Sequence, residues 1–155
     1  MVLPLVWGAS IASYPFFGKT SETTGRLLAL QSDCSIKEPQ RRMAEQYGDH
    51  SGIEKAVTRV VQTQTSWQAL TRDETAKRVI KIQAVLIDDD ELTTWLIEAA
   101  VRYAAKPVSV SSLQSLPVLF PFKLTRPLSY LASNSPALVL RSEGPRNQFV
   151  ELKRI

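Results

Sequence analysis

Residues 52–67, GIEKAVTRVVQTQTSW, constrain the fold most strongly, because their spacing predicts an amphipathic helix. The apolar residues recur every three or four positions and form one stripe that must be buried: Ile53, Ala56, Val57, Val60, Val61 and Trp67. The opposite face carries cations, amides and hydroxyls: Lys55, Thr58, Arg59, Gln62, Thr63 and Ser66. Such groups contact phosphates and base edges, although one acid, Glu54, interrupts the face. The stretch therefore predicts a helix for nucleic-acid contact, with a plain solvated helix face as the alternative.

The composition is that of a globular chain with a modest positive surplus. At 155 residues the chain suits one ordinary domain or two very small ones, and 44% hydrophobic with 22% charged residues excludes general disorder. The formal charge of +4 favours a polyanionic or acidic partner. Up to Gln83 there are eleven lysines and arginines against eight acids, and the remainder has eight against seven. Most of the surplus therefore lies with the predicted helix.

The cysteine and histidine usage limits the chemistry of the chain. Cys34 is the single cysteine, so neither an internal disulfide nor a metal site built on cysteines is expected, and a reducing cytoplasm is the simplest location. His50 is the single histidine and lies in the polar stretch 47–52, where we interpret it as a turn residue rather than a catalytic base. We expect no metal, no cofactor and no enzymatic activity.

Residues 1–17 are almost uncharged, but they do not fit a signal peptide or a membrane span. No basic segment precedes the apolar run, and Pro4, Gly8 and Pro15 interrupt it. We therefore assign residues 1–19 as an apolar N-terminal arm, extended or forming an edge strand, that packs onto the body or onto another subunit. We expect no association with membranes.

Two short motifs imitate a nucleotide hydrolase. Gly18, Lys19 and Thr20 resemble the end of a phosphate-binding loop, and VLIDDD at residues 85–90 resembles the strand and acid that hold magnesium in such enzymes. The loop also needs a glycine with four residues between it and Gly18, yet Ser13 stands there and the four residues are bulky. An ATPase is therefore only a minor alternative.

The first half of the chain predicts three helices followed by a β ribbon. The helices cover residues 20–31, 36–47 and 52–67. Ser35 and Glu38 form a capping box before the second helix, and either Asp49 or Ser51 is expected to cap the third. The ribbon is predicted from strands at 67–70 and 79–85, separated by a polar loop.

The stretches SIKEPQRRMAEQYG, DHSGIEKAVTRVVQTQTSW and WQALTRDETAKRVIKI resemble the winged-helix branch of the helix-turn-helix proteins. The resemblance implies that the third helix enters the major groove of DNA and that the ribbon, or wing, contacts the adjacent backbone. The helix residues implied to face bases or phosphates are Lys55, Thr58, Arg59 and Gln62. The implied wing contacts are Arg72, Lys77, Arg78 and Lys81, and the implied backbone clamps are Ser35, Arg41 and Arg42.

The second half predicts a similar order of elements. A helix at 90–105 begins at Asp90, and we interpret the acids at 88–90 as helix-start charge rather than metal ligands. Short helices at 111–116 and 124–132 and a hairpin around EGPRN follow. One interpretation is a second, degenerate winged helix, whose optional phosphate contacts are Arg141, Arg146, Lys153 and Arg154. The other is a C-terminal hairpin that closes one larger domain.

These patterns predict a mainly α fold with small β-hairpins, an α+β fold of winged helix-turn-helix type. The units are expected at residues 20–87 and 88–155. The expected function is binding of double-stranded DNA, as a transcription regulator or as the DNA-contacting subunit of a bacterial phage-defence or mobile-element complex. The chain would then act as a homodimer or as a subunit of a larger complex. Because winged helices also dock proteins, the alternative is an adaptor or scaffold that does not bind DNA.

Overall fold

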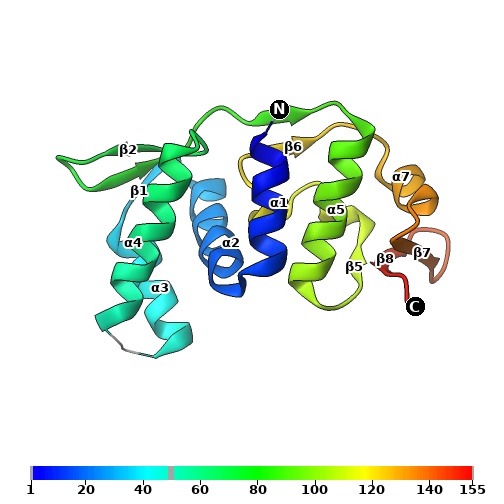
Figure 1. Cartoon of the computed structure of the whole chain (residues 1–155), viewed down its shortest axis with the longest axis horizontal. Coiled ribbons are helices and arrows are strands. Elements are labelled where there is room, and N and C mark those ends of the chain that lie inside the picture. The colour runs from blue at the N-terminus through cyan, green and yellow to red at the C-terminus, as the bar shows by residue number, and fades with distance from the viewer. Residues whose placement is uncertain (1, 49–50, 155) are drawn as a thin grey trace.

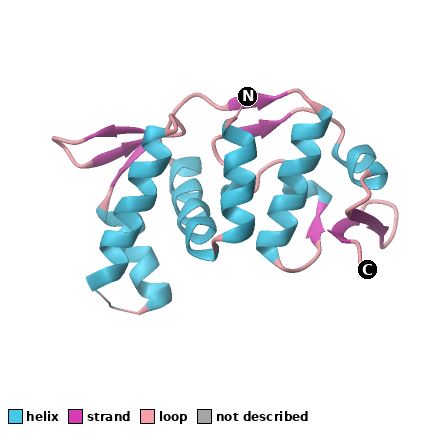
Figure 2. Cartoon of the chain, viewed as in Figure 1, coloured by secondary structure: helices cyan, strands magenta, loops and turns pink. Residues whose placement is uncertain are grey.

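The computed structural model describes residues 2–48 and 51–154, with the backbone but not the side chain of Ser51. Four helices stand side by side along the long axis in Figure 1: α4 (Ser51–Ser66), α2 (Pro15–Leu30), α1 (Leu3–Ser13) and α5 (Asp90–Ala104). Short strands form small sheets at the edges of this helical layer (Figure 2). The α+β class predicted from the sequence is therefore confirmed.

The N-terminal segment is helical, which corrects the extended arm predicted for residues 1–19. Pro4 and Pro15 each occupy the first turn of a helix, where the missing N–H has no helical partner to lose, so they begin α1 and α2 rather than breaking them. α1 lies between α2 and α5 (Figure 1), and the Trp7 side chain is fully buried. The Trp7 indole N–H donates to the Val118 carbonyl at 2.9 Å. Trp7 and Ile11 of this segment are thus part of the core, whereas Leu5 is exposed.

The first unit continues from α2 through a strand, two helices and a hairpin: β1 (Asp33–Ser35), α3 (Lys37–Tyr47), α4, β2 (Thr71–Asp73) and β3 (Arg78–Ile80). The three strands form an antiparallel sheet in the order β1-β3-β2. The ribbon after the third helix is present, but the strand predicted at 67–70 is wrong. Gln68 has a left-handed φ of 64°, and the Ala69 N–H donates to the Gln64 carbonyl at 2.9 Å, so these residues close the end of α4.

The apolar stripe predicted for α4 is buried within the first unit. Val57 and Val61 have no exposed surface. Their cluster joins α2, β1, α3 and the hairpin: Leu27, Leu28, Cys34, Ile36, Met43, Leu70 and Val79. Val60 and Trp67, on the flank of the stripe, pack against the larger cluster built around α1 and α5. α4 is therefore held in its rotation about its own axis by contacts on two sides.

The chain between the two units forms a further strand. β4 (Val85–Ile87) pairs in parallel with β6 (Phe122–Leu124), a contact that the sequence did not predict. The single strand predicted at 79–85 is instead divided between β3 and β4. α5 then begins as expected, except that Asp89 rather than Asp90 is its cap, because the Asp89 carboxylate accepts the Leu92 N–H at 2.9 Å.

After α5 the second half of the chain continues through β5 (Val108–Ser109), α6 (Val110–Leu113), η1 (Pro117–Leu119), β6, α7 (Leu128–Asn134), β7 (Leu138–Ser142) and β8 (Gln148–Leu152). This order resembles that of the first unit except that β6 lies between η1 and α7. The sheet of the second unit has the order β5-β8-β7, so the last strand again lies in the middle. The C-terminal hairpin predicted from the sequence is confirmed.

The two units are packed together through α2 and η1. At Gly25 a Cβ atom would lie only 2.1 Å from the Pro117 carbonyl oxygen, so the absence of a side chain permits the close approach. The larger core cluster also takes residues from both units, including Phe17 of α2 and Leu119 of η1. In residues 2–48 and 51–154, no helix combines the length and the apolar character that crossing a membrane requires.

Candidate nucleic-acid interface

α4 presents one exposed polar strip to solvent. At about 100° per residue, Lys55, Arg59, Gln62 and Ser66 span only about 60° of the helix circumference. All four are exposed, and we call them the α4 strip. On the opposite side Gln64 is fully buried, and its amide nitrogen donates to the Ser21 hydroxyl at 2.8 Å. This buried hydrogen bond to α2 and the apolar stripe together hold the strip outward.

The two cations of the α4 strip make no ion pair with any carboxylate of the described residues. Their charges therefore face solvent rather than an internal partner. Beside the strip, Glu54 lines a depression between α3 and α4 together with two further acids, Glu38 and Glu45, and two cations, Lys37 and Arg41. The charge on this side of the strip is therefore mixed.

Thr58 was predicted to face bases or phosphates, but its hydroxyl is used inside the protein. It donates to the Glu54 carbonyl at 2.9 Å and accepts from the Gln40 amide at 2.9 Å. Thr58 therefore belongs to the contact between α3 and α4. Sequence reasoning did not single out Gln40, which lies 18 residues away and shares no local pattern with Thr58.

The three predicted backbone clamps differ in how free they are. Arg41 bridges Glu45 at 2.9 Å and Glu38 at 3.4 Å, so two carboxylates compensate its charge. Arg42 is exposed and pairs with no acid among the described residues. The capping box predicted for Ser35 and Glu38 is wrong, because Ser35 ends β1 and Ile36 is the N-cap of α3 without a side-chain cap bond, although the Ser35 hydroxyl accepts the Lys37 N–H at 3.3 Å.

Arg72 and Arg78, the cations predicted for the β2–β3 hairpin, point to opposite faces of the sheet. Arg72 lies opposite Val79, which lies opposite Cys34, and the last two are core residues on the α4 side. Because neighbouring residues of a strand point to opposite faces, Arg72 faces α4 and Arg78 faces away from it. Arg72 is half-buried, and its Nε atom is buried without a hydrogen-bond partner among the described residues.

Arg78 forms an ion pair on the far face of the sheet. Its Nε donates to Asp33 at 2.6 Å. This hydrogen bond lowers the pKa of Asp33 and raises the pKa of Arg78. Arg78 therefore joins β1 to β3 and is directed away from the α4 strip.

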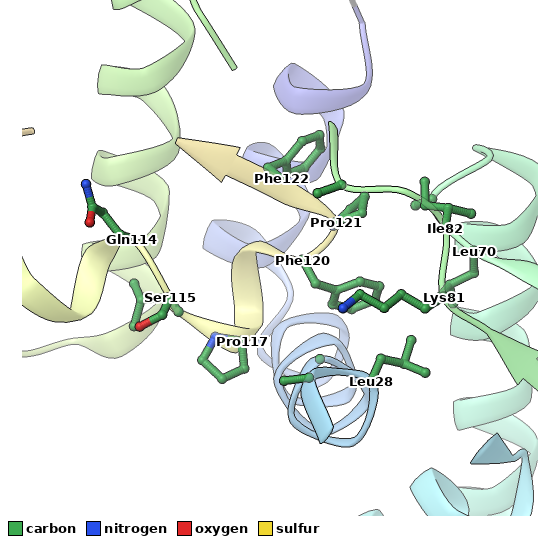
Figure 3. A pocket seen from close by; sticks show the side chains of 15 residues that line it. Leu28, Leu70, Lys81, Ile82, Gln114, Ser115, Pro117, Phe120, Pro121 and Phe122 are labelled. Atoms are coloured by element: carbon green, nitrogen blue, oxygen red, sulfur yellow. The ribbon is translucent and has the colours of Figure 1, made fainter. Parts of the chain in front are cut away.

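The end of the wing carries charges of both signs. Lys77 is exposed, as are the neighbouring Asp73 and Glu74. Asp73 accepts the Ala76 N–H at 3.1 Å and so closes the turn. Lys81 lies beyond the wing, and its side chain lines a pocket beside α2 (Figure 3). Of the four cations predicted to contact DNA from the hairpin, Arg78 is therefore paired with an acid and Lys81 lies away from the hairpin.

The structure accounts for the acidic run 88–90. Asp89 caps α5, while Arg126 pairs with Asp90 at 2.6 Å and with Asp88 at 3.6 Å. Arg126 lies 36 residues after Asp90, so no local sequence pattern could predict this pairing. Within the described ranges, no three metal-ligating side chains of the His, Cys, Asp or Glu type gather in one place.

The phosphate-binding loop considered from the sequence does not form. Gly18, Lys19 and Thr20 lie within α2, so their amides belong to a helix. Lys19 pairs with Glu22 at 3.6 Å, and Thr20 is fully buried. The predictions for His50 and for the cap of α4 at Asp49 or the Ser51 side chain lie outside the described residues.

Comparisons of the chain with protein-family models, with curated proteins and with solved structures found no match.

Proposed function

We propose that the chain binds double-stranded DNA through a winged-helix unit formed by α2, β1, α3, α4 and the β2–β3 hairpin. The observation that carries the proposal is the α4 strip, whose two cations and one amide are exposed on a helix fixed in rotation by its buried face. α4 would enter the major groove, and the hairpin that follows it would lie beside the backbone. The proposed assembly on DNA is a homodimer or a larger complex of which the chain is a subunit.

The topology of the unit supports this proposal. The unit contains three helices followed by a hairpin, the order of elements on which the winged-helix resemblance of the sequence rests. The dimensions also agree. From Lys55 to Ser66 the strip rises about 16 Å along the helix axis at about 1.5 Å per residue. The helix is about 10–12 Å across with its side chains, which fits a major groove about 12 Å wide.

The proposed roles follow from which side chains are free. Arg59 and Gln62, near the middle of the strip, read base edges, and Lys55 contacts a phosphate. Arg42 and Arg72 contact the flanking backbone. Thr58, Arg41 and Arg78 act mainly through the internal partners they already have, which are respectively Gln40, two glutamates and Asp33.

Salt dependence is the most direct test, because each neutralised phosphate contributes about −0.9 to the slope of log K against log salt. The three phosphate contacts proposed for Lys55, Arg42 and Arg72 would give a slope of about −2.7. We would titrate a labelled duplex pool with the protein at several salt concentrations. Replacing Lys55 and Arg59 together by alanine should reduce the slope by about 0.9, through the phosphate contact of Lys55, and weaken binding tenfold or more.

The matched control is Lys106→Ala, which removes an exposed cation just beyond α5 in the other unit. This variant should keep the affinity and slope of the parent protein, and circular dichroism should show both variants folded. Equal slopes for the parent and the Lys55/Arg59 variant would refute the assignment of the α4 strip.

A protein-docking adaptor is the second candidate function. It is favoured by the mixed charges in the depression between α3 and α4 and at the end of the β2–β3 hairpin, since neither surface is uniformly positive as a phosphate-binding surface would be. This function predicts no salt-dependent binding to any duplex. The same titration therefore separates the two candidates.

A further inference from the structure

A pocket of about 260 Å³ lies between α2, the turn after α4, the chain joining β3 to β4, and the segment around η1 (Figure 3). Its walls are apolar and come from both halves of the chain: Leu28, Leu70, Ile82, Leu116, Phe120 and Phe122. Ala29 and Ala84 also line it and are exposed to solvent. The pocket therefore opens to the surface, so a molecule can enter it without unfolding the core.

Lys81 is the only charged residue among those that line this pocket. Its backbone N–H donates to the Ser32 carbonyl at 2.9 Å, which fixes the start of the side chain beside β3. In Figure 3 the side chain extends from the β3–β4 chain toward the segment that carries Phe120. No carboxylate of the described residues forms an ion pair with its ammonium group.

The remaining polar side chains lie across the pocket from Lys81. Gln114 and Ser115 stand on the opposite side in Figure 3, and both are exposed. They offer an amide and a hydroxyl, which can hydrogen-bond to a ligand or to water. The pocket thus combines a mainly apolar interior with one uncompensated positive charge and two neutral polar groups at its edge.

We infer that this pocket binds a small amphipathic monocarboxylate, with its hydrocarbon part between Leu28 and Phe122 and its carboxylate on Lys81. A single cation matches a single negative charge, and apolar walls would desolvate a multiply charged ligand without compensating it. At the usual protein packing density of about 0.75, the pocket holds roughly 190 Å³ of ligand atoms, or about ten to thirteen non-hydrogen atoms. A medium-chain fatty acid or a phenyl-substituted short acid has this size.

Octanoate is a suitable probe, with octanol as its uncharged counterpart. Binding of each would be measured by isothermal titration calorimetry on the full chain without DNA, so the result does not depend on the proposed function. We expect the parent protein to bind both, and octanoate more tightly. Lys81→Met should weaken octanoate binding about fivefold to tenfold and leave octanol binding unchanged, because the variant removes the charge and keeps an apolar side chain.

Two further variants complete the test. Ala84→Trp should fill the pocket from its exposed edge and abolish binding of both probes, while Lys106→Met, a cation away from the pocket, should change neither. Thermal melting would verify that each variant is folded. The inference is overturned if the parent protein does not bind octanoate, if Lys81→Met binds it as tightly as the parent, or if folded Ala84→Trp retains binding.

Discussion

Gly25 provides a sharp test of how the two units pack. A Cβ atom at this position would lie 2.1 Å from the carbonyl oxygen of Pro117 and 2.9 Å from its carbonyl carbon. Because backbone rather than a flexible side chain blocks the position, no change of rotamer relieves the contact. Restoring a normal van der Waals distance requires α2 and η1 to separate by roughly 1 Å. We therefore expect Gly25→Ala to destabilise the protein.

The size of this effect follows from two opposing contributions. The separation would loosen Val118 and Leu119, which are 3% and 2% exposed, and the 2.9 Å hydrogen bond from Trp7 to the Val118 carbonyl. Such overpacking costs about 1–3 kcal/mol. Because a contact of 2.1 Å to backbone is severe, the cost should lie in the upper part of that range, about 2–3 kcal/mol. Replacing a glycine within a helix by alanine recovers about 0.5–1 kcal/mol. The net loss should then be about 1–2.5 kcal/mol, or a fall in Tm of about 2–10 °C for a chain of this size.

Urea unfolding followed by circular dichroism measures this difference, and Gly52→Ala is the matched control. Gly52 also lies in a helix, but a Cβ there would meet no atom of the described residues within 4 Å. This variant should equal the parent or exceed its stability by up to about 1 kcal/mol. If Gly25→Ala unfolds at the same or a higher urea concentration than the parent protein, the close approach of α2 to η1 is refuted.

Two further predictions concern titratable groups of the first unit. The hydrogen bond from Arg78 lowers the pKa of Asp33 below its usual 3.8, so the native state binds that proton more weakly than the unfolded chain does. The pair therefore stabilises the fold above pH 3.8, and this stabilisation is lost as the pH falls through the lowered native pKa. The stability difference between the parent and Asp33→Asn should accordingly shrink in acid, and denaturant titrations showing a constant difference from neutral to strongly acidic pH would contradict this. Burial raises the pKa of the Cys34 thiol, so a chromogenic disulfide reagent should modify native protein at least about tenfold more slowly than urea-unfolded protein. Equal rates would show that Cys34 is accessible.

Local periodicity was sufficient to predict several elements of the fold. The spacing of apolar residues in α4 predicted the burial of Val57 and Val61, because a stripe on one helix face has to be removed from water. Other local signals predicted the start of α5, from the acids that favour a helix N-terminus, and the C-terminal hairpin, from two short strands around a Gly-Pro turn. The exposure of Lys55 and Arg59 followed from the same helical period.

The N-terminal helix shows where local patterns fail. α1 is apolar on all sides, so it has no polar face from which a helical period can be read. Pro4 and Pro15 suggested that the apolar segment is interrupted, although in the fold they occupy the first turns of α1 and α2. Only its position between α2 and α5 explains why so apolar a segment is stable as a helix (Figure 1).

The sequence by itself determined which segments are amphipathic and which face of α4 is polar. The tertiary structure decided which polar groups of that surface are free. Thr58 meets Gln40, and Arg78 meets Asp33 across 45 residues of sequence. A shift of one residue in the pairing of β2 with β3 would exchange the faces of their side chains, and with them the direction of Arg72. Such partners depend on strand register and helix packing, which bring distant residues together and leave no periodic signal in the chain.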